Sequence, residues 1–213
     1  MFNWLKKKAS KPEEVQPQAP EVLGLRLGGA FELDDLKFRM LEPDLVIEGA
    51  SRTQIIQAVG EVTLDDNTRL LRFYTDDDGY LQVLQHGLDD SGVAEVKLFY
   101  FYDTKPIDVQ SVWDSWLDTD LVKPSASLEE KTFYKVWEND RPIAMTEKTF
   151  DREGRITETD QFVMLYEREV NQHYAESLLI ACEETAKTPH QLERCVTYIT
   201  GINVSATDFT VIG

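Results

Sequence analysis

The feature that most constrains the fold is a regular alternation of short β-prone segments with turn residues from position 23 onward. Segments rich in β-branched and aromatic side chains recur at roughly eight to fifteen residue spacing, which is the rhythm of an antiparallel sheet. The clearest pair is Thr68–Thr75 and Tyr80–Gln85, which flank an Asp-Asp-Asp-Gly turn. Gly79 can supply the positive φ that a tight hairpin turn requires, so the pattern predicts a hairpin here.

Further segments share this composition and are predicted as strands: Leu45–Glu48, Gln54–Leu64, Val96–Tyr102, Phe133–Trp137, Ile143–Phe150, Arg155–Thr159, Gln161–Glu169, Val196–Ile202 and Phe209–Ile212. Asp151–Gly154 predicts a second hairpin turn, between Ile143–Phe150 and the strand that follows it. We also expect Phe133–Trp137 to pair back onto the next strand through Glu138–Pro142.

Two short helices are predicted. Asp108 can cap a helix whose apolar residues recur at three and four positions and form one stripe: Val109, Val112, Trp113, Trp116 and Leu117. Leu33–Leu41 is a second candidate, which Pro43 would stop, and Ala175–Ala186 fits either a strand or a short helix. The expected fold class is mainly β or α+β, with antiparallel sheets or a partly closed barrel and one or two short helices.

The chain of 213 residues divides by composition into three parts. Residues 1–11 form an amphipathic cationic tip, residues 12–22 are a proline-rich linker, and residues 23–213 are predicted as an acidic, mainly β domain. A domain of this size can build a core without disulfides or metals. A division of the domain into two subdomains that meet near 104–128 stays open.

The charge is distributed as unevenly as the composition. The formal net charge is −17, with 39 acidic and 22 basic side chains. Lys6, Lys7, Lys8 and Lys11 are the only charged side chains of the tip, so the rest of the chain carries −21. Nucleic acid is excluded as an expected partner, because binding to it begins with Lys and Arg neutralising phosphates.

The tip is the leading candidate for an interaction site. Its interfacial apolar residues stand beside three cations that would attract anionic headgroups: Phe2, Trp4, Leu5, Lys6, Lys7 and Lys8. Three lysines offer about 3 kcal/mol near such a surface. We expect contact with a membrane surface or a protein partner; packing of the tip on the body, or a tip without fixed structure, is the open alternative.

No sequence motif indicates a reaction, a metal or a cofactor, so none of these is predicted and no catalytic residue is assigned. Asp76–Gly79 resembles part of a calcium loop, but the ligand spacing of an EF-hand is not met. An enzyme, or a pocket for a cationic, polyamine-like ligand, is the alternative to a binding module. Such a pocket would draw on acidic, aromatic and basic residues from two predicted strands and one turn: Tyr74, Asp76, Asp78, Tyr166, Glu167 and Arg168.

The two cysteines, Cys182 and Cys195, are placed symmetrically about Thr188-Pro189. A hairpin centred there would set them opposite each other on neighbouring strands, so either a redox switch or two buried thiols can be expected. The sequence has two cysteines and no secretory signal, which predicts a cytoplasmic protein. It has no apolar run near the roughly twenty residues of a spanning helix, so we expect contact with a membrane only at its surface.

Several longer stretches resemble the YjfK-like family of bacterial proteins, a domain family of unknown function. They are Leu23–Gly29, Leu41–Leu45, Ser51–Gln54, Arg72–Gly79, Lys97–Tyr102 with Thr104–Pro106, and Met164–Glu169. The resemblance implies no reaction or cofactor. It implies a genomic setting beside phage-shock-like membrane-stress scaffolds and glutathionylspermidine synthase-like enzymes. We therefore expect an accessory protein of non-enzymatic function, with such a scaffold as its protein partner.

Overall fold

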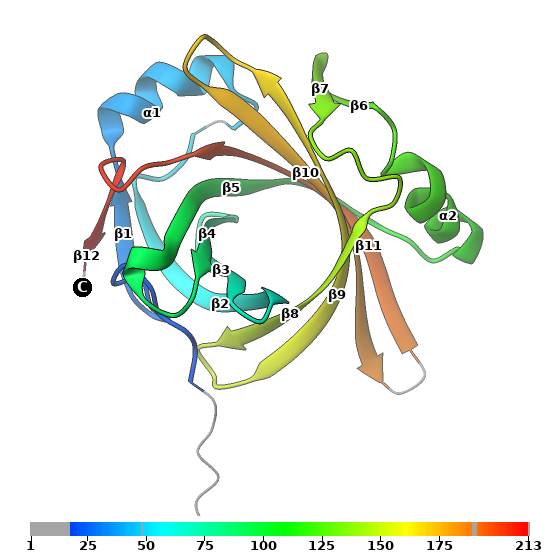
Figure 1. The fold of residues 1–213 in the computed structure, drawn as a ribbon, viewed down its shortest axis with the longest axis horizontal. Coiled ribbons are helices and arrows are strands. Elements are labelled where there is room, and N and C mark those ends of the chain that lie inside the picture. The colour runs from blue at the N-terminus through cyan, green and yellow to red at the C-terminus, as the bar shows by residue number, and fades with distance from the viewer. Residues whose placement is uncertain (1–17, 48, 189–190, 213) are drawn as a thin grey trace, which may run out of the picture.

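A closed barrel of eight antiparallel strands is the centre of the computed structural model, which describes residues 18–47, 49–188 and 191–212 (Figure 1). Four strands form a first meander: β2 (Thr53–Asp65), β3 (Thr68–Thr75), β4 (Gly79–His86) and β5 (Val93–Pro106). Four more form a second: β8 (Ile143–Asp151), β9 (Ile156–Glu169), β10 (Ala175–Thr188) and β11 (Gln191–Asn203). β5 pairs with β11 and β8 pairs with β2, so the two meanders close on each other. The prediction of a mainly antiparallel β protein is confirmed.

Both predicted hairpins are present, but the glycine of the first has another role. Gly154 has φ +78° in the β8–β9 turn, as expected. In the β3–β4 turn the positive φ of 50° belongs to Asp78. Gly79 is required for close approach instead, because a Cβ there would stand 2.6 Å from the backbone oxygen of Phe99 on β5.

Four short strands extend the barrel wall. β1 (Ala30–Leu33) lies between β2 and β12 (Phe209–Ile212), and β6 (Ser125–Leu128) pairs with β7 (Lys131–Lys135). The prediction that Phe133–Trp137 pairs with the following strand is wrong. β7 pairs with β6 and with β9, where Tyr134 lies opposite Glu167. The segment before β8 is a loop containing Pro142, which is too long for a tight turn.

The predicted strand at Leu45–Glu48 is also wrong for Leu45–Ile47, while Glu48 lies outside the described residues. Leu45–Ile47 follows a 3₁₀ turn, η1 (Glu42–Asp44), and has irregular backbone. All three side chains are buried, Leu45 and Ile47 in one apolar cluster and Val46 in another. Apolar residues at this site therefore anchor a loop between two cores.

The helices are short, as predicted. α1 (Asp35–Leu41) is capped by Asp34, whose side chain accepts a hydrogen bond of 2.7 Å from the Lys37 N–H. α2 (Gln110–Ser115) continues into a π-helical turn, η3 (Trp116–Asp120). Asp108 is not its cap, because the helix begins at Gln110 and the N-cap is Val109. A further 3₁₀ turn, η2 (Asp90–Gly92), precedes β5.

Ala175–Ala186, which fits two structures by sequence, is a strand, and its register corrects the cysteine prediction. On β10 and β11 Cys182 lies opposite Val196, and Cys195 lies opposite Glu183. The two cysteines are thus one position out of register. Because alternate residues of a strand face opposite sides of a sheet, the thiols project to different faces of the barrel wall.

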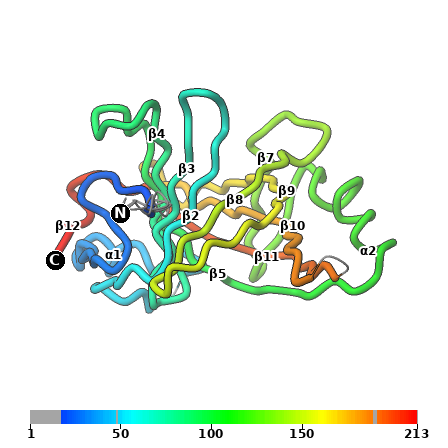
Figure 2. The backbone as a smooth tube through the Cα atoms, turned by 90° about the horizontal axis from the view of Figure 1, so that it is seen from below, coloured from blue at the N-terminus to red at the C-terminus, as the bar shows by residue number. Residues whose placement is uncertain are grey.

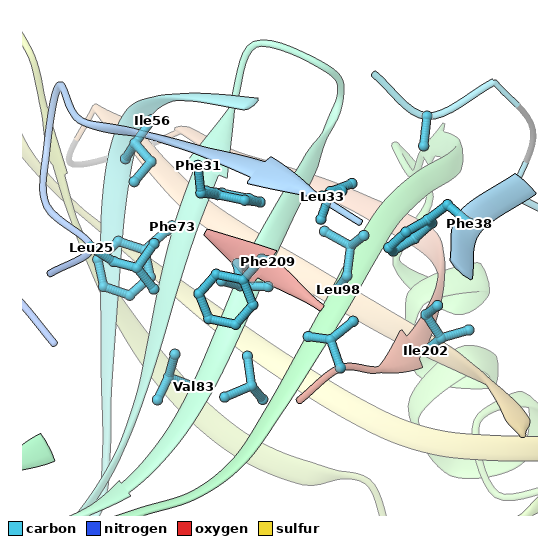
Figure 3. Close-up of a cluster of buried hydrophobic side chains, with 14 of the residues drawn as sticks. Leu25, Phe31, Leu33, Phe38, Ile56, Phe73, Val83, Leu98, Ile202 and Phe209 are labelled. Carbon is cyan, nitrogen blue, oxygen red and sulfur yellow. The ribbon is translucent and has the colours of Figure 1, made fainter. Parts of the chain in front are cut away.

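Two apolar clusters cover the barrel from outside. One joins β1, α1 and β12 to the outer face of the first meander, where Phe31 and Phe209 pack near Phe73 and Leu98 (Figure 3). The other joins α2 and β7 to the second meander around Trp113. Figure 2 shows α1 and α2 on opposite sides of the barrel. Strands before and after residues 104–128 share this one barrel, and Val22, placed by composition in the linker, is 3% exposed in the first cluster.

Candidate functional site

The candidate site is a cavity of about 440 Å³ inside the barrel. Of the sixteen residues that line it, eleven are apolar and five are polar or charged: Arg72, Gln82, Glu95, Lys97 and Glu167. A volume of this size falls within the range of roughly 300–1,000 Å³ that is typical of small-molecule sites. The cavity adjoins a packed apolar cluster inside the barrel, because Phe99, Val163 and Leu179 belong to both.

Strand alternation explains how these side chains reach the interior. On β3, Leu70 and Arg72 line the cavity, while Leu71 and Phe73 belong to the outer cluster with α1. β4 and β5 repeat the pattern: the cavity is lined by Gln82, Leu84, Glu95 and Lys97, and the outer cluster contains Leu81, Val83, Val96 and Leu98. Both faces of the wall are therefore buried, which conceals the alternation of apolar and polar residues expected for a strand with one exposed face.

Arg72 is the centre of the polar contacts in the barrel and is 3% exposed. Its Nη1 donates to Glu147 at 2.6 Å and to Gln161 at 2.7 Å, and its Nε donates to Gln82 at 3.1 Å. Glu147 also accepts from the Tyr74 hydroxyl at 2.7 Å. Because both charges are buried, the pair needs these additional hydrogen bonds to offset the loss of hydration.

Lys97 forms a second polar cluster in the cavity lining. It is 5% exposed, and its Nζ lies 3.1 Å from Glu167, 3.2 Å from the Ser177 hydroxyl and 3.8 Å from Glu95. This cluster contains one cation and two carboxylates, and both carboxylates are partly exposed. It is thus a second charged group in the cavity lining, beside Arg72.

The opening is formed by the end of β2 and by the loop between β7 and β8. Leu64 and Val136 both line the cavity and are 44% and 43% exposed. The backbone N–H of Val136 donates to Leu165 at 3.0 Å, which fixes the loop to β9. Trp137, the next residue, contacts both the interior core and the α2 cluster. An aromatic side chain therefore forms part of the cavity wall beside its opening.

Burial dominates the chemistry of titratable groups in the interior. Glu183 accepts a hydrogen bond of 3.2 Å from Gln161, and burial, followed by the charge of Glu147, raises the pKa of its carboxyl. Tyr80 is 1% exposed, and its hydroxyl has no hydrogen-bond partner among the described residues. Its ring packs on Phe99 at 5.3 Å and faces the Arg72 guanidinium at 5.5 Å. Burial in this interior therefore disfavours the charged form of a carboxyl group unless a nearby partner stabilises it.

Comparison with known proteins places the whole chain in one family. Residues 1–210 match the family described as "Protein of unknown function (DUF2491)". The chain belongs to the DUF2491 family. It is 27% identical over 198 residues to the uncharacterized protein YjfK of Escherichia coli strain K12, covering 90% of each chain. The resemblance to the YjfK-like family is thereby confirmed. No solved structure matches the chain.

In this DUF2491 protein, the first three residues of the pocket proposed from sequence lie at the end of β3 and in the turn that follows it. Tyr74 is inside, bonded to Glu147. Asp76 and Asp78 are in the β3–β4 turn, where Asp76 accepts from the backbone of Ile55 at 2.9 Å. The Asp78 carbonyl accepts from Phe101. These carboxyl and carbonyl groups stabilise the turn.

The other three are consecutive on β9 and alternate between the faces of its wall. Glu167 faces inward and lines the cavity. Tyr166 faces outward, where its hydroxyl donates to the Leu121 carbonyl at 2.8 Å, and Arg168 bonds to Glu176 at 2.8 Å. Of these six described residues, Glu167 lines the cavity and the other five do not, so the structure does not gather them in one pocket.

The sequence pattern did not predict the cavity of this protein, because the polar residues of the cavity lie within apolar strands. Arg72 follows two leucines and precedes a phenylalanine, and Lys97 stands between Val96 and Leu98. A cation with apolar residues on both sides in a strand is a signal of a buried, paired charge. That signal was available in the sequence, but the nearest carboxylate partners of the two cations, Glu147 and Glu167, lie on strands 70 or more residues away.

The tip residues assigned to membrane or partner contact lie outside the described residues: Phe2, Trp4, Leu5, Lys6, Lys7 and Lys8. Within the described part of this family member, no group of three or more His, Cys, Asp or Glu side chains is arranged to hold a metal ion. No described helix has the length and apolar character needed to span a bilayer.

Proposed function

We propose that this DUF2491 protein is a binding module that encloses a small, mainly apolar molecule in its barrel. The observation that carries the proposal is the interior cavity of about 440 Å³ with eleven apolar lining residues. Apolar surface of the ligand and of the wall that is removed from water would contribute about 25 cal/mol per Å² to the free energy of binding. The wall is built from both meanders, so one ligand would contact both halves of the barrel.

The lining favours binding over catalysis. Among the described residues that line the cavity there is no serine, cysteine or histidine. The four charged residues of the lining are all in ion pairs: Arg72, Glu95, Lys97 and Glu167. A nucleophile or a general base needs a free, reactive group directed at the substrate.

A cationic, polyamine-like ligand is the alternative that the acidic composition suggested. The two carboxylates of the lining, Glu95 and Glu167, already face Lys97. A polyamine would have to displace that lysine and would leave the apolar wall without a partner. We therefore favour an apolar ligand and include spermidine in the test.

The test is titration of the full-length protein with N-phenyl-1-naphthylamine, an uncharged dye that fluoresces in apolar surroundings. We expect saturable binding of one dye per chain. Leu84→Trp, which places a larger side chain in the cavity, should abolish it. Leu36→Trp on the exposed face of α1, where Leu36 is 71% exposed, is the matched control and should bind normally. No saturable binding by the wild type, or equal binding by both variants, would refute the proposal, and displacement by spermidine would favour the alternative.

From the sequence we further propose that the tip contacts a membrane surface or a membrane-associated partner. The support is the arrangement of Phe2, Trp4 and Leu5 beside Lys6–Lys8. Sedimentation with vesicles containing anionic lipid should recover the full-length protein but not a form lacking residues 1–11. A form with glutamine at positions 6, 7 and 8 separates the charge from the apolar contribution. Equal, weak binding by all three forms would argue against membrane contact.

The protein partner we propose is a phage-shock-like membrane-stress scaffold, which rests on the resemblance described above. Co-purification from the native cell should recover that scaffold with the full-length protein, and recovery should fall when residues 1–11 are removed. Recovery that is independent of the tip would place the contact on the acidic body. Absence of the scaffold from both samples would count against this partner.

A further inference from the structure

One end of the Arg72 guanidinium is directed at a weak acceptor in the cavity wall. Nε and Nη1 have oxygen acceptors in Gln82, Glu147 and Gln161. The partner of Nη2 is the Sδ of Met145, at 3.9 Å. A thioether is a weak acceptor, and Arg72 and Met145 both line the cavity. Nη2 therefore retains donor capacity for a stronger acceptor at the surface that a ligand would meet.

Both cations of the cavity lining already have carboxylate partners. Arg72 is paired with Glu147 at 2.6 Å, and Lys97 is paired with Glu167 at 3.1 Å. An anionic ligand group beside Arg72 would also face Glu147, and a cationic group would face two cations. An anion would lose its hydration without gaining an unpaired cation, and a cation would meet carboxylates, Glu95 and Glu167, that already face Lys97. Either loss of hydration is costly in a buried site.

The barrel contains an internal example of this cost. Glu183 reaches the same polar layer through Gln161, whose Nε2 also donates to Glu147 at 3.0 Å. Burial and, after it, the charge of Glu147 raise the pKa of Glu183, and together they outweigh the lowering effect of Arg72. A ligand carboxylate brought to Arg72 would meet the same two effects.

We infer that the cavity selects an uncharged, mainly apolar molecule whose carbonyl or other acceptor oxygen takes a hydrogen bond from Nη2 of Arg72. This inference rests on the proposed function, because it requires that the cavity bind a ligand. It adds the chemical class of that ligand: ketones, esters and similar neutral oxygen compounds bind, whereas free fatty acids and alkylamines of the same length are rejected.

Displacement of N-phenyl-1-naphthylamine by matched nine-carbon compounds tests the class. We expect 2-nonanone to displace the dye from the full-length protein at a concentration at least about tenfold lower than nonanoate or nonylammonium. Equal displacement by either ion would overturn the inference and leave the proposed function intact, as would dye that binds but is displaced by none of the three. Failure of the dye itself to bind would instead refute the proposed function.

The contact with Arg72 has its own readout. The carbonyl stretch of bound 2-nonanone should lie at a lower frequency than in alkane solution, because hydrogen bonding to a guanidinium weakens the C=O bond. A frequency equal to the alkane value would overturn the contact. This measurement uses the wild-type protein and so does not depend on the folding of any variant.

A charge-removing variant tests why anions are rejected. Glu147→Gln keeps an acceptor for Arg72 but removes the negative charge behind it, so nonanoate affinity should rise by about tenfold. Glu61→Gln, on β2 and paired with Arg69 at 2.9 Å, is the matched control outside the cavity lining and should leave nonanoate affinity unchanged. An equal change in both variants would contradict the proposed role of Glu147. If Glu147→Gln fails to fold, as judged by circular dichroism, the infrared measurement decides the inference.

Discussion

Glu147 occupies the space that a side chain at position 60 would need: a Cβ built on Gly60 would stand 1.7 Å from the Glu147 Oε1. Gly60 is on β2 and Glu147 is on β8, the two strands whose pairing closes the barrel. Because Gly60 has no side chain, Glu147 can enter the interior and pair with Arg72 where β2 meets β8.

Gly60→Ala should lower the free energy of unfolding by about 3 kcal/mol, because the new methyl group would displace the carboxylate that pairs with Arg72. Urea denaturation checks this value. Gly154→Ala is the control: it lies in the β8–β9 turn with φ +78° and no atom within 4 Å of a new Cβ. It should cost only about 1 kcal/mol, from backbone strain alone. Equal losses would show that Gly60 does not make room for Glu147.

Tyr80→Phe should raise the free energy of unfolding by about 1 kcal/mol, because it removes a buried hydroxyl that has no hydrogen-bond partner among the described residues. Tyr74→Phe is the matched control. Its hydroxyl donates to Glu147 at 2.7 Å, so its loss should destabilise the protein by about 1–3 kcal/mol. Thermal and urea unfolding of the two variants should therefore shift in opposite directions, and a loss of stability in Tyr80→Phe would contradict the assignment.

The two thiols should neither pair nor react readily. Burial raises the pKa of Cys182 to about 12 and that of Cys195 to about 11, from an ordinary value of 9.0. At pH 8 the thiolate fraction of Cys195 should be lower by about a hundredfold, so alkylation by iodoacetamide should be slow until denaturant is added. Mass spectrometry after mild oxidation should show no two-dalton loss. A disulfide that forms in the native protein would contradict the out-of-register placement.

Stability should fall at neutral pH because of Glu183. Its folded-state pKa is raised above the ordinary value of 4.5, so its contribution to stability is complete below about pH 4.5 and is lost as the pH rises through the folded-state value. Glu183→Gln should therefore stabilise the protein at pH 7 and leave its stability near pH 4 almost unchanged. Glu184→Gln removes an ion pair with Arg194 and should not stabilise the protein at pH 7. Urea midpoints measured from pH 4 to pH 8 check both variants.

The hairpins were predictable because their information is local. Asp-rich turns with glycine, flanked by β-branched segments, identified β3, β4 and β8 within a few residues, whereas the two segments predicted after the second turn, Arg155–Thr159 and Gln161–Glu169, form the single strand β9. The packing of residues distant in sequence was not predictable in this way. Leu45–Ile47 has the composition of a strand, but its side chains are buried in two separate clusters, so no regular backbone forms.

The cavity also depended on pairings distant in sequence. Arg72 has no local sequence feature that indicates its ion pair, because its partner Glu147 is on β8, 75 positions further along the chain. Likewise, a single-residue shift in the β10–β11 register moved Cys195 to the other face from Cys182. Turn chemistry sets which strands are neighbours in a hairpin, but register and barrel closure determine which side chains meet.

The closure of the barrel has a consequence for synthesis. The first meander is complete at Pro106, but the partners of its outer strands arrive later: β8 ends at Asp151 and β11 at Asn203. While the chain emerges from the ribosome, the part of β2 that pairs with β8, Ala58–Val62, and the edge of β5 are therefore unpaired for much of translation. Such edges can pair with other chains. Conditions that slow elongation between residues 106 and 203 should accordingly increase the share of newly made protein that aggregates or associates with chaperones.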